Sequence, residues 1–132
     1  MTYVDPAIWA IVGASTAAEI VAALILVRRM GYPTKGLARA LVFINVTTWA
    51  GFAVALDTLL GREWRFVPAV ASAEVLVVAA ETVLIRAATE RRWAGRPPLP
   101  YGPAFVVSLA GNAVSIAVSV GLLFSVAPHL FE

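Results

Sequence analysis

The sequence predicts an all-α integral membrane protein whose four transmembrane helices form two antiparallel hairpins. The first observation behind this fold class is composition, because the 132 residues are 61% hydrophobic and 14% charged, with a mean hydropathy of +0.86. A soluble domain of this length cannot bury so much apolar surface, whereas a membrane protein requires it. The second observation is that four separate stretches reach the length of about 20 mainly apolar residues that a spanning helix needs. Residues 1–132 are therefore predicted to form a single transmembrane domain.

The four predicted spans have residue types near their ends that are typical of helix termini. The spans cover about residues 6–27, 37–59, 67–88 and 103–126. Asp5 and Pro6 suit the N-cap and the first position of the first helix. Gly61 suits the exit from the second, while Pro68 and Pro103 fall in the first turns of the third and fourth.

Basic residues are concentrated in two of the three links between spans. The links after the first and third spans, with the adjoining helix ends, hold eight, against only Arg62 and Arg65 on the opposite side. The eight are Arg28, Arg29, Lys35, Arg39, Arg86, Arg91, Arg92 and Arg96. The positive-inside rule places both links in the cytoplasm and both termini on the outer, periplasmic or extracellular side. We expect Trp93 at the cytoplasmic interface, and we expect the pairs Arg28–Arg29 and Arg91–Arg92 to contact lipid headgroups or dock a partner subunit.

Three glutamates lie inside the otherwise apolar stretches: Glu19, Glu74 and Glu81. A carboxylate near the bilayer centre costs about 2.5–3.5 kcal/mol on insertion scales, so a glutamate there indicates a function or a pairing. No Lys or Arg lies deep in any predicted span, so an internal counter-ion is not expected. Each carboxyl is expected to hold a proton and donate a hydrogen bond, to stay ionised and bind a cation, or to pair with a basic residue of another chain.

Each predicted span also carries a polar stripe along one face. The stripes comprise Ser15 with Glu19, Asn45 with Thr48, Glu74 with Glu81, and Ser108 with Asn112, Ser115 and Ser119. Spacings of three, four and seven residues place side chains on the same side of a helix. Four stripes favour a shared polar interior. Hydrogen bonding between helices accounts for the Asn, Ser and Thr residues without any further role, but it explains the costlier glutamates less well.

Two of the glutamates open similar patterns in the two halves of the chain. Glu19 is followed by paired arginines, a Pro-containing link and then Asn45-x-x-Thr48, and Glu81 is followed in the same way by Asn112-x-x-Ser115. Both halves start on the same side, so the pattern predicts a parallel repeat related by a pseudo-twofold axis along the membrane normal. Chance similarity in a chain rich in Ala and Val is the alternative.

Several classes of function lack their residues. The chain has no cysteine, which excludes disulfides and thiol chemistry, and its one histidine, His129, lies beyond the last span, which excludes bis-His haem ligation. Gly-rich phosphate loops, nucleophile elbows and His-Glu metal motifs are absent from the sequence. We therefore predict no enzymatic activity, no metal site and no cofactor. The basic residues lie in links instead of forming a face for nucleic acid, so nucleic acid is not an expected partner.

The first functional prediction is a small accessory or structural subunit of a larger bacterial membrane complex. It depends on the short links and on intramembrane polar groups able to pair across subunits. The alternative is a small oligomeric proton- or cation-coupled transporter or channel that uses Glu19 and Glu81, or Glu74; a lipid- or quinone-handling enzyme ranks third. The expected partners are the lipid bilayer and either other membrane subunits or further copies of the chain. Arg outnumbers Lys nine to one, which is typical of GC-rich bacterial genomes, so the expected location is a bacterial cytoplasmic membrane.

Overall fold

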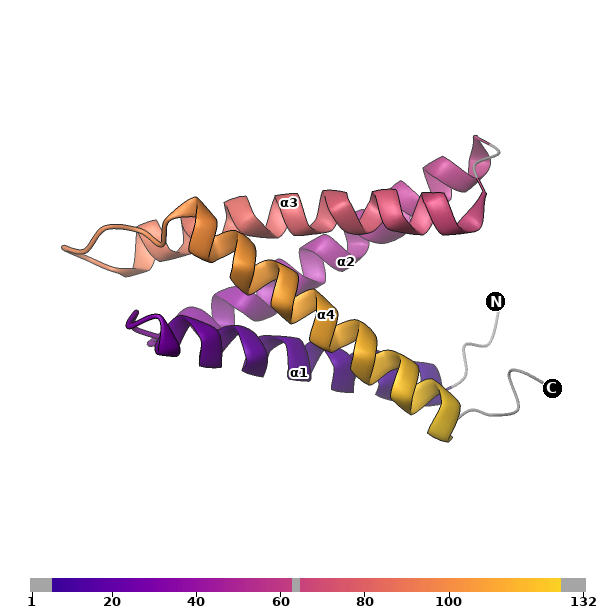
Figure 1. Ribbon diagram of the computed structural model, residues 1–132, viewed down its shortest axis with the longest axis horizontal. Helices are drawn as coiled ribbons and strands as arrows, with labels where there is room; N and C mark the ends of the chain where they lie inside the picture. Colours follow the sequence, from indigo (N-terminus) through magenta and orange to yellow (C-terminus); the bar gives the residue numbers. More distant parts are fainter. Residues whose placement is uncertain (1–5, 63–64, 127–132) are drawn as a thin grey trace.

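The computed structural model describes residues 6–62 and 65–126, and these form four α-helices. They are α1 Pro6–Arg29, α2 Leu37–Gly61, α3 Phe66–Arg92 and α4 Tyr101–Val126 (Figure 1). Each helix is long and apolar enough to cross a membrane, which confirms the all-α fold and the four segments able to span it. Asp5 and His129 lie outside the described residues.

The helix boundaries agree with the predicted spans except where α3 continues past its apolar stretch. It ends at Arg92, four residues beyond the predicted end at residue 88. The extra turn contains Glu and Arg, which are good helix formers although they are polar. Apolarity therefore marks the part of a helix that suits lipid, while backbone hydrogen bonding decides where the helix ends. Pro68 and Pro103 lie in the first turns of α3 and α4, as predicted.

Two links, one between α1 and α2 and one between α3 and α4, close the same end of the bundle. In the first, Gly31 has φ 83° and Gly36 has φ 74°, a left-handed conformation that a residue with a Cβ adopts only under strain. In the second, the Leu99 backbone N–H donates to Thr89 Oγ1 at 2.9 Å, and Arg86 Nη1 donates to the Leu99 carbonyl at 3.2 Å. The second link is therefore tied back onto the last turns of α3.

The four helices form a ring in which each contacts two others, in the order α1, α2, α3, α4. The α1–α4 and α2–α3 contacts are the most extensive, and the α1–α2 contact is the smallest. Figure 1 shows the reason, because α2 and α4 each cross from one neighbour to the other along their length. The α1/α4 and α2/α3 pairs then diverge toward the end away from the two links (Figure 1). The helices within each half of the chain therefore share less surface with each other than with the opposite half.

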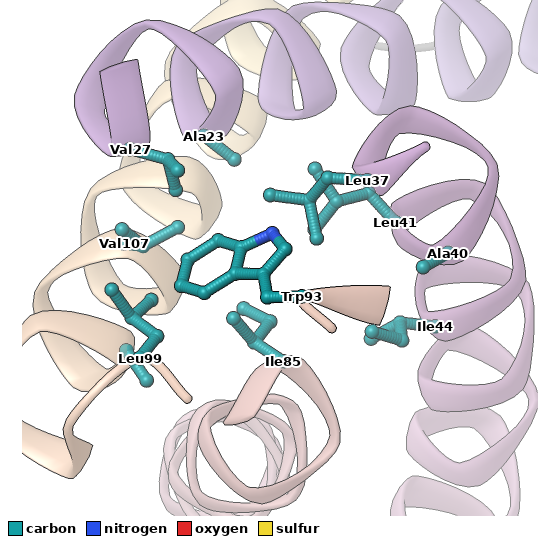
Figure 2. Close-up of a cluster of buried hydrophobic side chains, with 11 residues drawn as sticks. Ala23, Val27, Leu37, Ala40, Leu41, Ile44, Ile85, Trp93, Leu99 and Val107 are labelled. Carbon is teal, nitrogen blue, oxygen red and sulfur yellow. The ribbon is translucent and has the colours of Figure 1, made fainter. Parts of the chain in front are cut away.

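The apolar core lies at the link end of the bundle. Trp93 is at its centre, only 5% exposed, and side chains of all four helices surround it (Figure 2). Val27, Leu37 and Leu99 are fully buried nearby, and the ring of Tyr32 stacks on that of Trp93 with centroids 5.4 Å apart. The Trp93 Nε1–H has no acceptor among the described residues. Trp93 is thus a core residue, because the turn after α3 folds its ring between the helices.

Large apolar side chains cover the outside of all four helices. Trp9 of α1 is 56% exposed, Phe43 of α2 71%, Val75 of α3 68% and Phe105 of α4 47%. Soluble monomers rarely expose extended apolar surface, whereas lipid tails cover such a surface at no cost. The distribution of side chains is that of a bundle whose exterior suits lipid.

Candidate functional site

Glu81 of α3 is the most completely bonded polar group in the described part of the bundle. Its side chain is 3% exposed, and its two carboxylate oxygens accept three hydrogen bonds. Thr48 Oγ1 of α2 donates to Oε1 at 2.9 Å. From α4, Ser108 Oγ donates to Oε2 at 2.7 Å and Asn112 Nδ2 donates to the same oxygen at 2.6 Å. Hydrogen bonds to a carboxylate are stronger than neutral ones, so three helices are held together at this side chain.

Glu19 of α1 occupies a similar position on the other side of the interior. It is 7% exposed, and the side chains of Asn45 and Ser115 interact with its carboxyl group. Gly111 of α4 lies directly against it, because a Cβ built at Gly111 would lie 3.0 Å from Glu19 Cγ. A larger residue here would require Glu19 or one of the two helices to shift, so the glycine permits the close approach of α1 and α4.

Glu74 differs from the other two glutamates in its surroundings. It lies seven residues before Glu81 on the same face of α3 and is half-buried. Its carboxyl group interacts electrostatically with that of Glu81, and Glu19 is within electrostatic reach of both. No hydrogen bond between Glu74 and another described side chain accompanies these interactions. Glu74 is therefore the least engaged of the three carboxyl groups.

All three glutamates line one cavity of about 270 Å³, to which the four helices contribute. The cavity also contains the other polar candidates from the sequence, namely Asn45, Thr48, Asn112 and Ser115. Trp49 and Phe52 of α2 add aromatic surface to its wall. Among the described residues, those that line it include no Lys, Arg or His. The structure thus brings every intramembrane candidate together around one space that has three acidic groups and no basic one among its described lining residues.

Ser108 and Gly111 contact the glutamates although neither lines the cavity, and Trp49, which does line it, was not predicted as a site residue. Ser108 lies on the same predicted face as Asn112, four residues away, but only the structure assigns it to the Glu81 carboxylate. Gly111 has no polar side chain to mark it, although its position between Ser108 and Ser115 is a signal of close helix approach. Trp49 is 51% exposed and stands within 6.4 Å of Trp9, measured between ring centroids.

The paired arginines are not part of the cavity. Arg28 and Arg29 are exposed in the last turn of α1, about 13 Å along the helix axis from Glu19. Arg91 and Arg92 are exposed in the last turn of α3 and line, with Arg39, a hollow between α2 and α3. Three guanidinium groups around one hollow at the link end suit an anionic headgroup.

No protein-family model, curated protein or solved structure matches this chain. Four-helix bundles carry many unrelated functions, so any inference about function has to come from the residues that line the cavity. Carboxylate, amide and hydroxyl oxygens bind hard cations and protons. In residues 6–62 and 65–126, no group of three acidic or imidazole side chains is close enough to hold one metal ion. The separated carboxylates suit protons or a polyatomic cation better than a single caged ion.

Proposed function

We propose that this protein is a small multi-pass membrane transporter that couples the movement of a cation to protons at the carboxylate-lined cavity. The observation that carries the proposal is the convergence of Glu19, Glu74 and Glu81 on one cavity without a basic side chain among its described lining residues. Three carboxylates in a low-dielectric interior repel one another, and protons or a bound cation neutralise them. A site that exchanges one for the other performs proton-coupled cation transport.

The alternative role of these residues is to hold helices together, and the cavity weighs against it. Asn and Ser side chains stabilise helix contacts without the insertion cost of a carboxylate. Glu81 joins α3 to α2 and α4, and Glu19 joins α1 to the same two helices, so Glu74, which no described side chain bonds, exceeds what assembly needs. A space of about 270 Å³ beside them is also what a binding site requires and what tight packing removes.

The proposal places the four helices across a bacterial cytoplasmic membrane, with both links in the cytoplasm and both termini outside. The excess of basic residues in the links and the apolar exterior support this placement. Because the chain has no cysteine, single cysteines introduced at Arg96 and Arg62 can test it. A membrane-impermeant maleimide added to intact cells should label the Arg62→Cys variant and leave Arg96→Cys unlabelled; the reverse pattern would invert the orientation.

The proposal also includes the duplicated hairpin and its pseudo-twofold axis, which reciprocal contacts support. Glu19 has Asn45 from its own half and Ser115 from the other. Glu81 has Asn112 from its own half and Thr48 from the other. In the repeat, Asn45 corresponds to Asn112 and Thr48 to Ser115, so the two glutamates have matching partners.

Buried positions on the helices follow the same correspondence. The buried residues of α1 are Ile11, Ser15, Glu19, Ala23 and Val27, and those 62 positions later on α3 are Ala73, Val77, Glu81, Ile85 and Thr89, all buried. Four of the five buried residues of α2, namely Leu37, Ala40, Leu41 and Ile44, match buried α4 residues at a shift of 67, namely Ala104, Val107, Ser108 and Gly111; the counterpart of the fifth, Thr48, is the half-buried Ser115. Two equivalent carboxylate sites on either side of a cavity suit a transporter that alternates between two openings.

Flux in liposomes tests the transport proposal. Purified protein is reconstituted with a pH-sensitive dye inside, and a tetramethylammonium gradient is imposed from outside. The wild type should exchange the cation for internal protons, and Glu19→Gln and Glu74→Gln should abolish the dye signal. Asp57→Asn, at an exposed position of α2 that does not line the cavity, is the matched control and should keep it. Equal signals from all four proteins would contradict a role for the carboxylates.

The accessory-subunit prediction remains the second candidate, and Glu74 is the observation that favours it. A half-buried carboxylate without a hydrogen bond from a described side chain also suits a basic residue of a partner subunit. Mild extraction from native membranes followed by a sizing column separates the two proposals. A transporter should elute as a monomer or small homo-oligomer, whereas a subunit should co-elute with larger proteins and leave them after Glu74→Gln.

A further inference from the structure

A second hollow, on the outer face of the bundle between α3 and α4, is larger and almost wholly apolar. It has a volume of about 600 Å³, and Val75, Val78, Phe105 and Leu109 form much of its wall. Val75, Phe105 and Leu109 are 68%, 47% and 49% exposed, so the groove faces the surroundings of the bundle. Along α4 it extends from Phe105 to Ile116, about 16 Å from the helical rise.

The groove and the carboxylate cavity share part of their lining. Glu74, Asn112 and Ile116 line both. Asn112 is engaged with Glu81, and Thr82, the remaining polar residue of the groove, donates its hydroxyl to the Val78 carbonyl at 2.7 Å. Glu74 is therefore the polar group still open to a ligand where the apolar groove meets the acidic cavity.

We propose that cavity and groove together bind an amphipathic cation, with its charged head among the carboxylates and its apolar tail in the α3–α4 groove. This inference rests on the proposed function and adds a substrate class and an entry route, which is lateral, from the lipid. The apolar groove has roughly twice the volume of the polar cavity, so the smaller space suits a compact charged head and the larger one an alkyl tail. A quaternary ammonium head and a single alkyl chain fit this division.

Charge favours an amphipathic cation over other molecules that could fill the apolar groove. An anionic lipid would bring like charge to three carboxylates, and a neutral lipid or a second copy of the chain would fill the groove without neutralising Glu74. A cation also gains from Trp49 and Phe52 in the cavity wall, because aromatic faces attract quaternary ammonium groups. The tail remains in an apolar environment throughout, so lateral entry requires no transfer of an alkyl chain through water.

Binding to the full chain in lipid nanodiscs tests the inference with three probes. Tetramethylammonium carries the head alone, dodecyltrimethylammonium carries head and tail, and dodecanoate carries the tail with the opposite charge. Empty nanodiscs correct for partitioning into lipid. The wild type should bind both cations and should not bind dodecanoate; equal binding of dodecanoate would overturn the requirement for positive charge.

Two tryptophan substitutions on α4 form a matched pair. Leu109→Trp fills the groove, whereas Val106→Trp adds the same side chain at an equally exposed position, 46% against 49%, that does not line it. Leu109→Trp should weaken dodecyltrimethylammonium binding roughly tenfold relative to Val106→Trp and leave tetramethylammonium binding unchanged. Ala113→Phe, which narrows the same groove from the next turn, should reproduce the effect, and the helical circular dichroism of each variant checks its fold.

The outcomes separate this inference from the proposed function. If Leu109→Trp and Val106→Trp bind the long-chain cation equally, the groove is not the tail site, while the cation site in the cavity stands. If the wild type binds neither cation, the cation site itself is wrong. A loss of both cations in Leu109→Trp with an intact fold would also overturn the separate roles of groove and cavity.

Discussion

The link end of the bundle and the cavity region differ in the side chains that fill them: the first is apolar and close-packed, and the second is polar and hollow. At the link end, apolar side chains from all four helices close around Trp93 and leave several residues with no exposed surface. Further along the helices, the same bundle surrounds a cavity of about 270 Å³ with three carboxylates. The difference indicates that the link end supplies most of the close packing, while the cavity region combines acidic groups with unfilled space.

The three glutamates also differ from one another in how many side chains their carboxyl groups contact. Glu81 is bonded to three side chains and Glu19 interacts with two, while Glu74 has only electrostatic interactions with the other glutamates. The number of side-chain partners therefore falls from Glu81 through Glu19 to Glu74. Substitutions should lose stability mainly near Trp93 and Glu81, and lose binding mainly at Glu74.

The largest loss of stability is expected from Trp93→Ala. Removing a buried Trp leaves a large void among close-packed side chains and should lower the free energy of unfolding by about 3–5 kcal/mol. Trp93→Phe is the control and should cost much less, since it keeps a ring and removes an Nε1–H that has no acceptor among the described residues. Thermal unfolding in detergent micelles, followed by circular dichroism, measures both. Equal costs would show that the link end does not dominate the packing.

The next effect concerns the bonded carboxylate. Glu81→Leu removes the shortest acceptor of Ser108 and Asn112 and leaves them backbone carbonyls at 3.4 Å and 3.0 Å, so it should destabilise the bundle by about 2 kcal/mol. Glu81→Gln keeps an oxygen for these donors, and the Thr48 hydroxyl has the Ile44 carbonyl as another acceptor at 2.9 Å, so it should cost about 1 kcal/mol. The same unfolding measurement distinguishes them. A Leu variant as stable as the Gln variant would mean that these hydrogen bonds contribute little.

Gly111→Ala tests the close approach of α1 and α4 at the cavity. The new Cβ would meet Glu19 Cγ at 3.0 Å, so Glu19 or the helix must move, at about 1–3 kcal/mol. Gly121→Ala on the same helix has open space around its Cβ and should instead stabilise α4 slightly through helix propensity. Opposite signs in the two unfolding midpoints are the expected result. If both Gly111→Ala and Gly121→Ala are stabilised, α1 and α4 can move apart at Gly111 at little cost.

Glu74→Gln should have the smallest effect on stability and a large one on function. Because no described side chain donates to its carboxyl group, the change in unfolding free energy should stay within about 0.5 kcal/mol. Binding of tetramethylammonium in nanodiscs should weaken at least roughly tenfold, because one charge of the cavity is lost. Trp93→Phe should show unchanged binding. If Glu74→Gln instead lowers the free energy of unfolding and leaves tetramethylammonium binding unchanged, Glu74 serves stability and not binding.

Much of the fold and part of the site follow from local sequence patterns. Four apolar stretches predict the four helices, and spacings of three, four and seven residues place Asn45 with Thr48 and Glu74 with Glu81 on common faces. Other features do not follow. Trp93 has the residue type of an interfacial anchor, yet the turn after α3 packs it into the core, which depends on contacts with residues far away in the sequence.

The sequence by itself determined the helices, the polar face of each and the residues that had to be accommodated in an apolar setting. Tertiary structure alone decided that Glu81 takes three donors and Glu74 none from the described side chains, and that the α3–α4 groove meets the cavity at Glu74. The physical reason is the distance along the chain between the residues that interact. Helix formation and its periodicity depend on residues within a few turns, whereas the partner of a buried carboxylate depends on how helices cross, and here α2 and α4 cross between neighbours.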